Sequence, residues 1–251
     1  MNIDPIHQFN IINLFKIGQF GDHAVYFTNS SAYMLLAVAL ISLLMIGGVA
    51  GGQLVPGRLQ SVAEITYEFV ASMIHSTAGK EGMKFFPLVF SLFTFICVSN
   101  LVGIIPYTFT ISSHIVVTAT LALLVFFIVL FYGLYKNGLK FFNIFVPSGI
   151  PIFILPLVVF IEIFSFFLKP ISHSVRLFAN MLAGHIALKV FAGFVAMLGF
   201  SLGAIGWIGG IAPLALTVAL TALELLVACL QAYVFAILTC IYLNDAIHPG
   251  H

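Results

Sequence analysis

The sequence predicts an all-α polytopic membrane protein with five transmembrane crossings, one in-plane amphipathic helix, and two long, strongly tilted helices at its C-terminal end. Of its 251 residues, 62% are hydrophobic and 7% are charged, whereas soluble domains are roughly 45–50% apolar and 25% charged. Apolar runs rich in Phe, Leu, Ile and Val fill nearly every segment after Ser31. One domain of this size cannot bury so much apolar surface by itself, so we expect a lipid bilayer to cover it.

Composition also excludes several classes of function. The formal net charge is +1, so there is neither a basic field for nucleic acid nor an acidic tail. The cysteines Cys97, Cys229 and Cys240 are isolated in apolar runs without CxxC spacing and are interpreted as small hydrophobic residues. The glycines within 47–52 lack the Lys and Ser/Thr of a phosphate loop. We therefore expect no metal, nucleotide or cofactor site in this chain.

The N-terminal part begins with a polar segment, 1–30, which lacks the features of a signal peptide and is expected to form an outer-side N-terminal segment. The first span, 31–50, has about the 20 apolar residues needed to cross a ~30 Å hydrocarbon core. Its terminal glycines form overlapping GxxxG registers, which permit close helix approach, although a flexible helix end explains them equally well. In 57–85, apolar residues recur at helical spacing and charged residues lie elsewhere, which predicts an in-plane amphipathic helix.

The remaining spans follow in order. Segments 87–106 and 114–135 form a helical hairpin, 87–135, whose connection YTFTISS contains no Lys or Arg. Segment 149–244 predicts two long helices separated by a glycine-rich stretch near 199–213. A helix over 150–198 would be about 70 Å long at 1.5 Å per residue, more than twice the membrane thickness. It must tilt strongly, lie partly in the membrane plane, or break at Pro156 or Pro170.

Cation placement predicts the orientation. Arg58, Lys80 and Lys84 flank the amphipathic segment, and Lys136 and Lys140 follow the hairpin. Loops rich in Lys and Arg stay on the cytoplasmic side, so we expect the N-terminus outside and the C-terminus in the cytoplasm. Lys16 is the single exception.

Ionisable residues inside the last two spans are the strongest functional signal. They are Glu162, Lys169, Arg176, His185, Lys189 and Glu224. An Arg at mid-membrane costs roughly 2.5–3.5 kcal/mol on insertion scales, so Arg176 is expected to face a polar partner or a wet cavity. Snorkelling to the interface explains Lys169 equally well and is the better explanation of Lys189.

Helical periodicity places these groups on defined faces. Steps of seven align Glu162, Lys169 and Arg176, and a second set of polar residues widens that face: Ser165, Ser172 and Asn180. His185 lies nine residues after Arg176, half a turn around, so it faces a different neighbour or requires a bent helix.

The last helix repeats the pattern with Thr217, Glu224, Gln231 and Tyr242 on one narrow face. Gln231 alone indicates an interhelical hydrogen bond, whereas Gln231 together with Glu224 favours a hydrated path.

One motif points elsewhere. Residues 199–203 read GFSLG, which matches the G-x-S-x-G pattern of hydrolase nucleophiles, and an intramembrane protease using Ser201 and His185 is the alternative that it raises. That motif needs a strand-turn-helix elbow, whereas here it lies in an apolar turn between membrane helices.

Three segments carry a resemblance to a known family: KPISHSVRLFANMLAGHIAL (169–188), ELLVACLQAYVFAILTCIYL (224–243) and FTFICVSNLVGIIPYTF (93–109). They resemble subunit a of the rotary F-type ATP synthase, which is itself non-catalytic. The resemblance implies a c-subunit ring, b-type peripheral stalk subunits and other synthase subunits as partners. It also implies that Arg176 is the essential proton-translocation arginine facing the ring, with Asn180, Gln231 and Glu162 among the polar groups around it.

Two positions resemble one branch of the family. Many bacterial members carry Glu after the A-G dipeptide and His on the last helix, whereas this chain has His185 and Glu224. The exchange resembles the alphaproteobacterial and mitochondrial branch, and the length and extended N-terminus favour a bacterial inner membrane over a mitochondrial one. One acid and one imidazole can together pass a proton or hold water.

The resemblance implies two proton half-channels. We expect His185, Glu224, Asn180 and Gln231 on the outer path and Ser172, Ser165 and Glu162 on the inner path. Tyr242, on the polar face of the last helix, is also expected on the proton path. An ion channel or secondary transporter with a midplane Arg/Glu site is the main alternative, but such folds usually show inverted repeats, and none is found here. A purely structural membrane anchor would not need Arg176 and Glu224 at mid-span.

Overall fold

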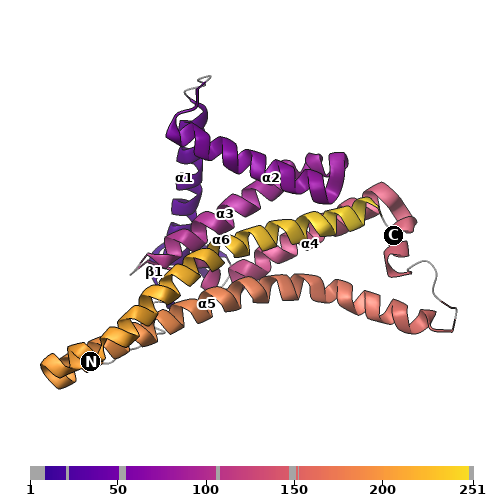
Figure 1. Cartoon of the computed structure of the whole chain (residues 1–251). Coiled ribbons are helices and arrows are strands. Elements are labelled where there is room, and N and C mark those ends of the chain that lie inside the picture. Colours follow the sequence, from indigo (N-terminus) through magenta and orange to yellow (C-terminus); the bar gives the residue numbers. More distant parts are fainter. Residues whose placement is uncertain are drawn as a thin grey trace. The chain divides into compact units, whose positions relative to one another are not determined.

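The computed structural model describes residues 9–20, 23–50, 55–105, 108–146, 151 and 153–248, with only the backbone described for residues 20, 23, 25, 201, 202, 204, 205, 207 and 208. The elements in chain order are β1 (Asn13–Phe20), β2 (His23–Thr28), α1 (Asn29–Val49), α2 (Arg58–Gly82), η2 (Met83–Phe85), α3 (Phe86–Ile104), η3 (Ile111–Ser113), α4 (Ile115–Asn137), η4 (Gly138–Phe145), α5 (Leu155–Gly209) and α6 (Ile211–Ile247) (Figure 1).

Long apolar helices dominate the described residues. Five stretches there are long and apolar enough to cross a membrane: Asn29–Val49, Arg58–Ile104, Ile115–Phe145, Leu155–Phe200 and Ile211–Ile247. The second stretch joins α2 and α3 across η2. The predicted class, a helical polytopic membrane protein, is confirmed.

The N-terminal segment contains a two-stranded sheet that the sequence analysis did not anticipate. Strands β1 and β2 pair antiparallel, with Lys16 opposite Tyr26 and Phe20 opposite His23. A two-residue Gly-Asp dipeptide between strand-like runs is a known hairpin signal and was present in the sequence. Gly21 and Asp22 themselves lie outside the described residues.

The end of α1 approaches α2 closely. A Cβ atom added at Gly48 would lie 2.8 Å from the Cβ atom of Ala63, so only glycine fits there without a shift. Small residues at such contacts let helix backbones approach in lipid. Gly51 and Gly52, which complete the GxxxG registers, lie outside the described residues.

Helix α5 is continuous through Pro170 and does not break there. Before the kink at Gly203 its regular part runs from Leu155 to Leu202, 48 residues, or about 72 Å at 1.5 Å per residue. Pro156 lies in its first turn, where the missing N–H costs nothing, and Pro170 removes a single intrahelical hydrogen bond. The only residue inside α5 with non-helical backbone angles is Gly203, with φ of 59° and ψ of −135°. The break therefore falls in the glycine-rich stretch and not at either proline.

The chain forms two compact units. Unit 1 comprises residues 1–41, 95–114 and 177–231, and unit 2 comprises residues 42–94, 115–176 and 232–251. Helices α1, α3, α5 and α6 each contribute a segment to both units.

Candidate functional site

A buried histidine and a buried glutamate meet in unit 1. The Nδ1 atom of His185 on α5 lies 3.3 Å from the Oε1 atom of Glu224 on α6, and the two side chains are 6% and 4% exposed. The contact has the distance of an ion pair but not the alignment of a hydrogen bond. Among the described residues, neither Glu224 oxygen has a hydrogen-bond partner. The carboxyl group therefore retains unused capacity to accept or donate a proton.

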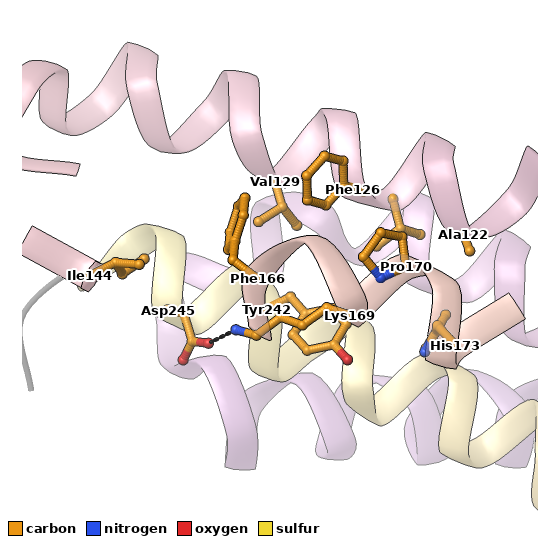
Figure 2. Close-up of a pocket in the computed structure, with 11 residues that line it drawn as sticks. Ala122, Phe126, Val129, Ile144, Phe166, Lys169, Pro170, His173, Tyr242 and Asp245 are labelled. Atoms are coloured by element: carbon orange, nitrogen blue, oxygen red, sulfur yellow. Dashed lines mark hydrogen bonds and ion pairs between the residues drawn. The ribbon is translucent and has the colours of Figure 1, made fainter. Parts of the chain in front are cut away.

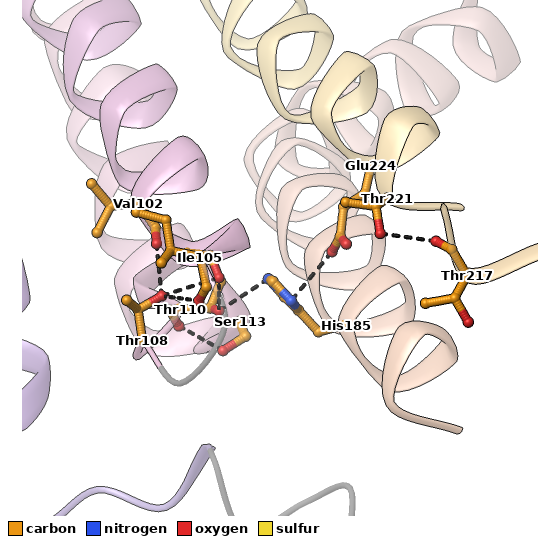
Figure 3. A network of polar contacts seen from close by, with 10 residues as sticks. Val102, Ile105, Thr108, Thr110, Ser113, His185, Thr217, Thr221 and Glu224 are labelled. Atoms are coloured by element: carbon orange, nitrogen blue, oxygen red, sulfur yellow. Dashed lines mark hydrogen bonds and ion pairs between the residues drawn. The ribbon is translucent and has the colours of Figure 1, made fainter. Parts of the chain in front are cut away.

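The other nitrogen of the imidazole meets a hydroxyl group. Nε2 of His185 lies 3.0 Å from Oγ1 of Thr110 (Figure 3). Thr110 is fully buried and follows α3, just before η3. His185 thus lies between a hydroxyl on one side and a carboxyl on the other.

This arrangement can pass a proton in either tautomer. A hydroxyl group both donates and accepts, so Thr110 can serve Nε2 whether or not that nitrogen carries a proton. A carboxyl group accepts when ionised and donates when protonated, so Glu224 can serve Nδ1 in the same two ways. Proton exchange between His185 and Glu224 therefore leaves both ring nitrogens with a suitable neighbour.

Glycines create the space for these contacts. A Cβ atom added at Gly184 would lie 2.8 Å from Oε1 of Glu224. A Cβ atom added at Gly103 would lie 2.9 Å from the Cγ2 atom of Thr110. The absence of a side chain at each position lets α6 and the Thr110 segment reach the imidazole.

Asn100 fixes the loop that carries Thr110. Its Nδ2 atom donates to the carbonyl of Ala228, at 3.2 Å, and its Oδ1 atom accepts from the hydroxyl of Ser112, at 2.5 Å. Asn100 is fully buried. One side chain thus joins α3, η3 and α6 within unit 1.

The polar face predicted on α5 is mainly exposed on this chain. Arg176, Asn180, Ser165 and Ser172 are exposed, and Glu162 is partly exposed. Because exposure of an arginine to hydrocarbon is costly, this face requires a polar neighbour from outside the chain or a wet cleft. The exposed face and the buried His185 therefore have different surroundings.

Three other residues predicted for the proton path are Gln231, Asn180 and Tyr242. Gln231 is buried in unit 1, but among the described residues neither its side chain nor that of Asn180 hydrogen-bonds to the His185–Glu224 pair. Tyr242 belongs to unit 2, where the Nζ atom of Lys169 lies 5.0 Å from its ring centroid (Figure 2). Within unit 1 the structure brings together His185 and Glu224, and among the described residues there it does not join Gln231 to them.

Several polar residues were missed by the sequence analysis. In unit 1 they are Asn100, Thr110 and Ser112, and in unit 2 they are His173 and Ser174, whose hydroxyl lies 3.0 Å from that of Thr118. Polar residues within apolar spans were the available signal. Small hydroxyl and amide groups are inexpensive enough to be common in membrane helices, so their signal is weaker than that of an Arg or Glu. His173 is the exception, because an ionisable imidazole inside an apolar span is a strong signal.

Neither a metal site nor a hydrolase site is visible in the described part of the chain. No three His, Cys, Asp or Glu side chains in those ranges gather as metal ligands would. The backbone at Ser201 is helical, whereas a nucleophilic serine of this motif lies at a turn between a strand and a helix. Only the backbone of Ser201 is described.

Fold and site together define a class: a polytopic helical membrane protein with an exposed arginine on a long helix and a buried His–Glu pair between two helices. The sequence profile of the ATP synthase A chain matches residues 31–244. The chain belongs to that family.

Curated relatives are similar along their full length. An ATP synthase subunit a from Bradyrhizobium diazoefficiens is 80% identical over 251 residues, covering 100% of both chains. One from Rhodopseudomonas palustris (strain TIE-1) is 75% identical over 251 residues, again covering 100% of both chains. One from Nitrobacter winogradskyi is 73% identical over 249 residues, covering 99% of this chain and 100% of the relative.

Proposed function

We propose that this chain is the stator subunit a of an F-type ATP synthase and forms two proton half-channels against a rotating ring. The observation that carries the proposal is the buried His185 imidazole between the Thr110 hydroxyl and the Glu224 carboxyl group. An unpaired ionisable group in this position would be expensive, whereas a chain of groups that exchange protons has a use for it. Membership of the ATP synthase A chain family disfavours a self-contained channel or transporter.

Two separate half-channels are needed because a continuous pore would discharge the membrane. In the proposal, protons enter from the outer side through His185, Glu224, Asn180 and Gln231. They then bind a carboxylate on a ring subunit and travel with the ring. They leave on the inner side past three polar residues of α5: Ser172, Ser165 and Glu162. Each proton that falls through 100 mV delivers about 2.3 kcal/mol to rotation.

Arg176 separates the two half-channels. Its guanidinium group stays charged at any physiological pH, so it stabilises the ionised form of a passing ring carboxylate and promotes proton release. The same positive charge repels a proton that would cross directly between the half-channels. Its exposure on α5 supports this role because the side chain is available to a partner.

Partners and location follow from the same proposal. A c-subunit ring would cover the exposed polar face of α5, and b-type stalk subunits would hold this chain stationary. The chain would contain no catalytic nucleotide site and would lie in a bacterial inner membrane. The cations at the end of α2 and after α4 favour an outer N-terminus and a cytoplasmic C-terminus.

Proton pumping by the whole complex tests the proposal. In inverted membrane vesicles, Arg176→Ala should abolish ATP-driven acidification while the complex remains assembled. Val175→Ala is the matched control, because Val175 is the exposed neighbour on the same helix, and it should pump like the wild type. Normal pumping by Arg176→Ala would overturn the assignment.

Co-purification tests the partners. Gentle solubilisation should recover a small two-helix proteolipid and a b-type subunit with this chain. Recovery of the chain without either of them would contradict the proposed assembly.

A further inference from the structure

An aromatic side chain from the N-terminal segment reaches the imidazole of His185. The ring centroid of Phe9 lies 6.3 Å from that of His185, at an interplanar angle of 59°, and both residues belong to unit 1. This spacing is within the range of favourable contacts between rings. The two ring nitrogens of His185 have Thr110 and Glu224 as neighbours, so Phe9 is a third neighbour of the same imidazole.

The Phe9 ring also lies near a cation. The Nζ atom of Lys189, one helical turn after His185 on α5, lies 5.5 Å from the ring centroid of Phe9. A cation within about 6 Å of a ring centroid is attracted to the face of the ring. A positive charge that approached the imidazole would instead repel a proton there. Phe9 therefore offers the ammonium group a neighbour other than the imidazole.

Asn29, the first residue of α1, holds the chain just after Phe9. Its Nδ2 atom donates to the carbonyl of Asn10 at 3.1 Å, and its Oδ1 atom accepts from the backbone N–H of Ile12 at 3.2 Å. The backbone N–H of Asn29 donates in turn to the carbonyl of Ile12 at 3.1 Å. The Phe9 ring is thus carried on a backbone that is anchored to the start of α1.

The burial of His185 gives this contact its importance. His185 is 5% exposed, whereas Phe9 is partly exposed. A flat ring is buried only when side chains pack against its faces as well as its edges, and hydrogen bonds at the nitrogens supply only edge contacts. Phe9 contributes a side chain at the rim of the site that packs against the buried imidazole.

We propose that Phe9 is a positioning residue for proton transfer at His185, and that Asn29 is the side chain that keeps Phe9 in place. The inference rests on the proposed function and adds the N-terminal segment to its outer half-channel. Contact with Phe9 limits rotation of the imidazole, so each ring nitrogen stays opposite its own partner. It also keeps water from the imidazole, so that protons arrive through the contacts at the nitrogens.

Removal of the ring tests the inference in the assembled complex. Phe9→Ala deletes the aromatic contact, whereas Phe9→Tyr keeps an aromatic ring. Phe15→Ala is the matched control, because Phe15 lies in the same N-terminal segment but stacks on Phe27, with the ring centroids 4.7 Å apart. Diethyl pyrocarbonate labels accessible imidazoles, and peptide mass spectrometry measures the rate of its reaction at His185. ATP-driven pumping in inverted vesicles is divided by the amount of assembled complex.

We expect Phe9→Ala to be labelled about threefold faster at His185 and to pump roughly fivefold more slowly, as for the loss of one aromatic contact. Phe9→Tyr and Phe15→Ala should stay within twofold of the wild type in both measurements. A labelling rate in Phe9→Ala equal to that of the wild type overturns the inference, as does pumping within twofold of it. A Phe9→Tyr variant as impaired as Phe9→Ala also overturns it.

Asn29→Asp tests the anchor and leaves Phe9 itself in place. The variant loses the N–H group that donates to the carbonyl of Asn10 and retains an oxygen that can accept from Ile12. Labelling of His185 should become faster, although by less than in Phe9→Ala. If Phe9→Ala fails to assemble, Asn29→Asp decides alone, and labelling at the wild-type rate then overturns the inference.

Arg176→Ala, measured in parallel, separates the two proposals. An inactive Arg176→Ala with a normal Phe9→Ala would remove the positioning role and leave the proposed function intact. Normal pumping in Arg176→Ala would remove the proposed function, while the labelling rate at His185 would still report whether Phe9 covers the imidazole.

Discussion

The Nδ1 atom of His185 lies 3.3 Å from the Oε1 atom of Glu224, in a place where both side chains are almost completely buried. Burial of one isolated charge is costly, but an acid and a base in contact can share a proton at no change in net charge. Thr110 supports the far side of the imidazole. The predictions below test this relationship and the side chains that hold it in place.

Exchanging the two residues tests whether they act as a pair. His185→Glu and Glu224→His should each lower proton pumping strongly, because each leaves two like groups in contact. The double exchange restores one acid and one imidazole and should retain more activity than either single variant. ATP-driven acidification of inverted vesicles measures all three, and an equal or greater loss in the double variant would argue against pairing.

Thr110→Val tests the hydroxyl side of the imidazole. The change keeps the shape of the side chain but removes the hydroxyl group that lies 3.0 Å from Nε2 of His185. We expect pumping to fall by roughly tenfold, equivalent to about 1.4 kcal/mol in the limiting step, with normal assembly. Thr120→Val is the control, because this exposed threonine donates to the Val116 carbonyl of its own helix, and it should leave pumping unchanged.

Gly184→Ala tests the close approach of α6. The added Cβ atom would lie 2.8 Å from Oε1 of Glu224, so the carboxyl group must leave the position in which it contacts His185. Pumping should fall although no polar group is lost. Gly47→Ala, where the added Cβ atom meets nothing within 4 Å, should pump normally, and a Gly184→Ala variant as active as this control would contradict the observed geometry.

Asn100→Leu tests the support of the Thr110 loop. It removes both hydrogen bonds of the side chain and leaves the buried Ser112 hydroxyl without the acceptor that Asn100 provided. Loss of a buried partner costs roughly 1–3 kcal/mol, so the purified complex should lose this chain at a lower temperature. Ser99→Ala is the control, because the buried Ser99 hydroxyl has no hydrogen-bond partner among the described residues, and its thermal stability should match or exceed that of the wild type.

The sequence allowed prediction of the helical class and the polar face of α5, because apolar content and helical periodicity act along one chain segment. It also placed the interruption of the long C-terminal segment in the glycine-rich stretch 199–213, where Gly203 and the boundary between α5 and α6 lie. A break at Pro156 or Pro170, one of three alternatives for the first long helix, does not occur. Continuity at Pro170 costs one hydrogen bond, and the long α5 accommodates that loss. The β1–β2 hairpin was missed because its signal was short and local.

Amino-acid order alone determined that this chain belongs in a membrane and that Arg176 lies on a polar helix face, since both follow from side-chain chemistry and a fixed rotation per residue. Only the tertiary structure decided that His185 meets Glu224 and Thr110. It also decided that Asn100 donates a hydrogen bond to the carbonyl of Ala228, which lies 128 residues later in the chain. Periodicity specifies the face that a residue occupies on its own helix. The partner that it meets depends on where distant glycines and small side chains let two backbones approach.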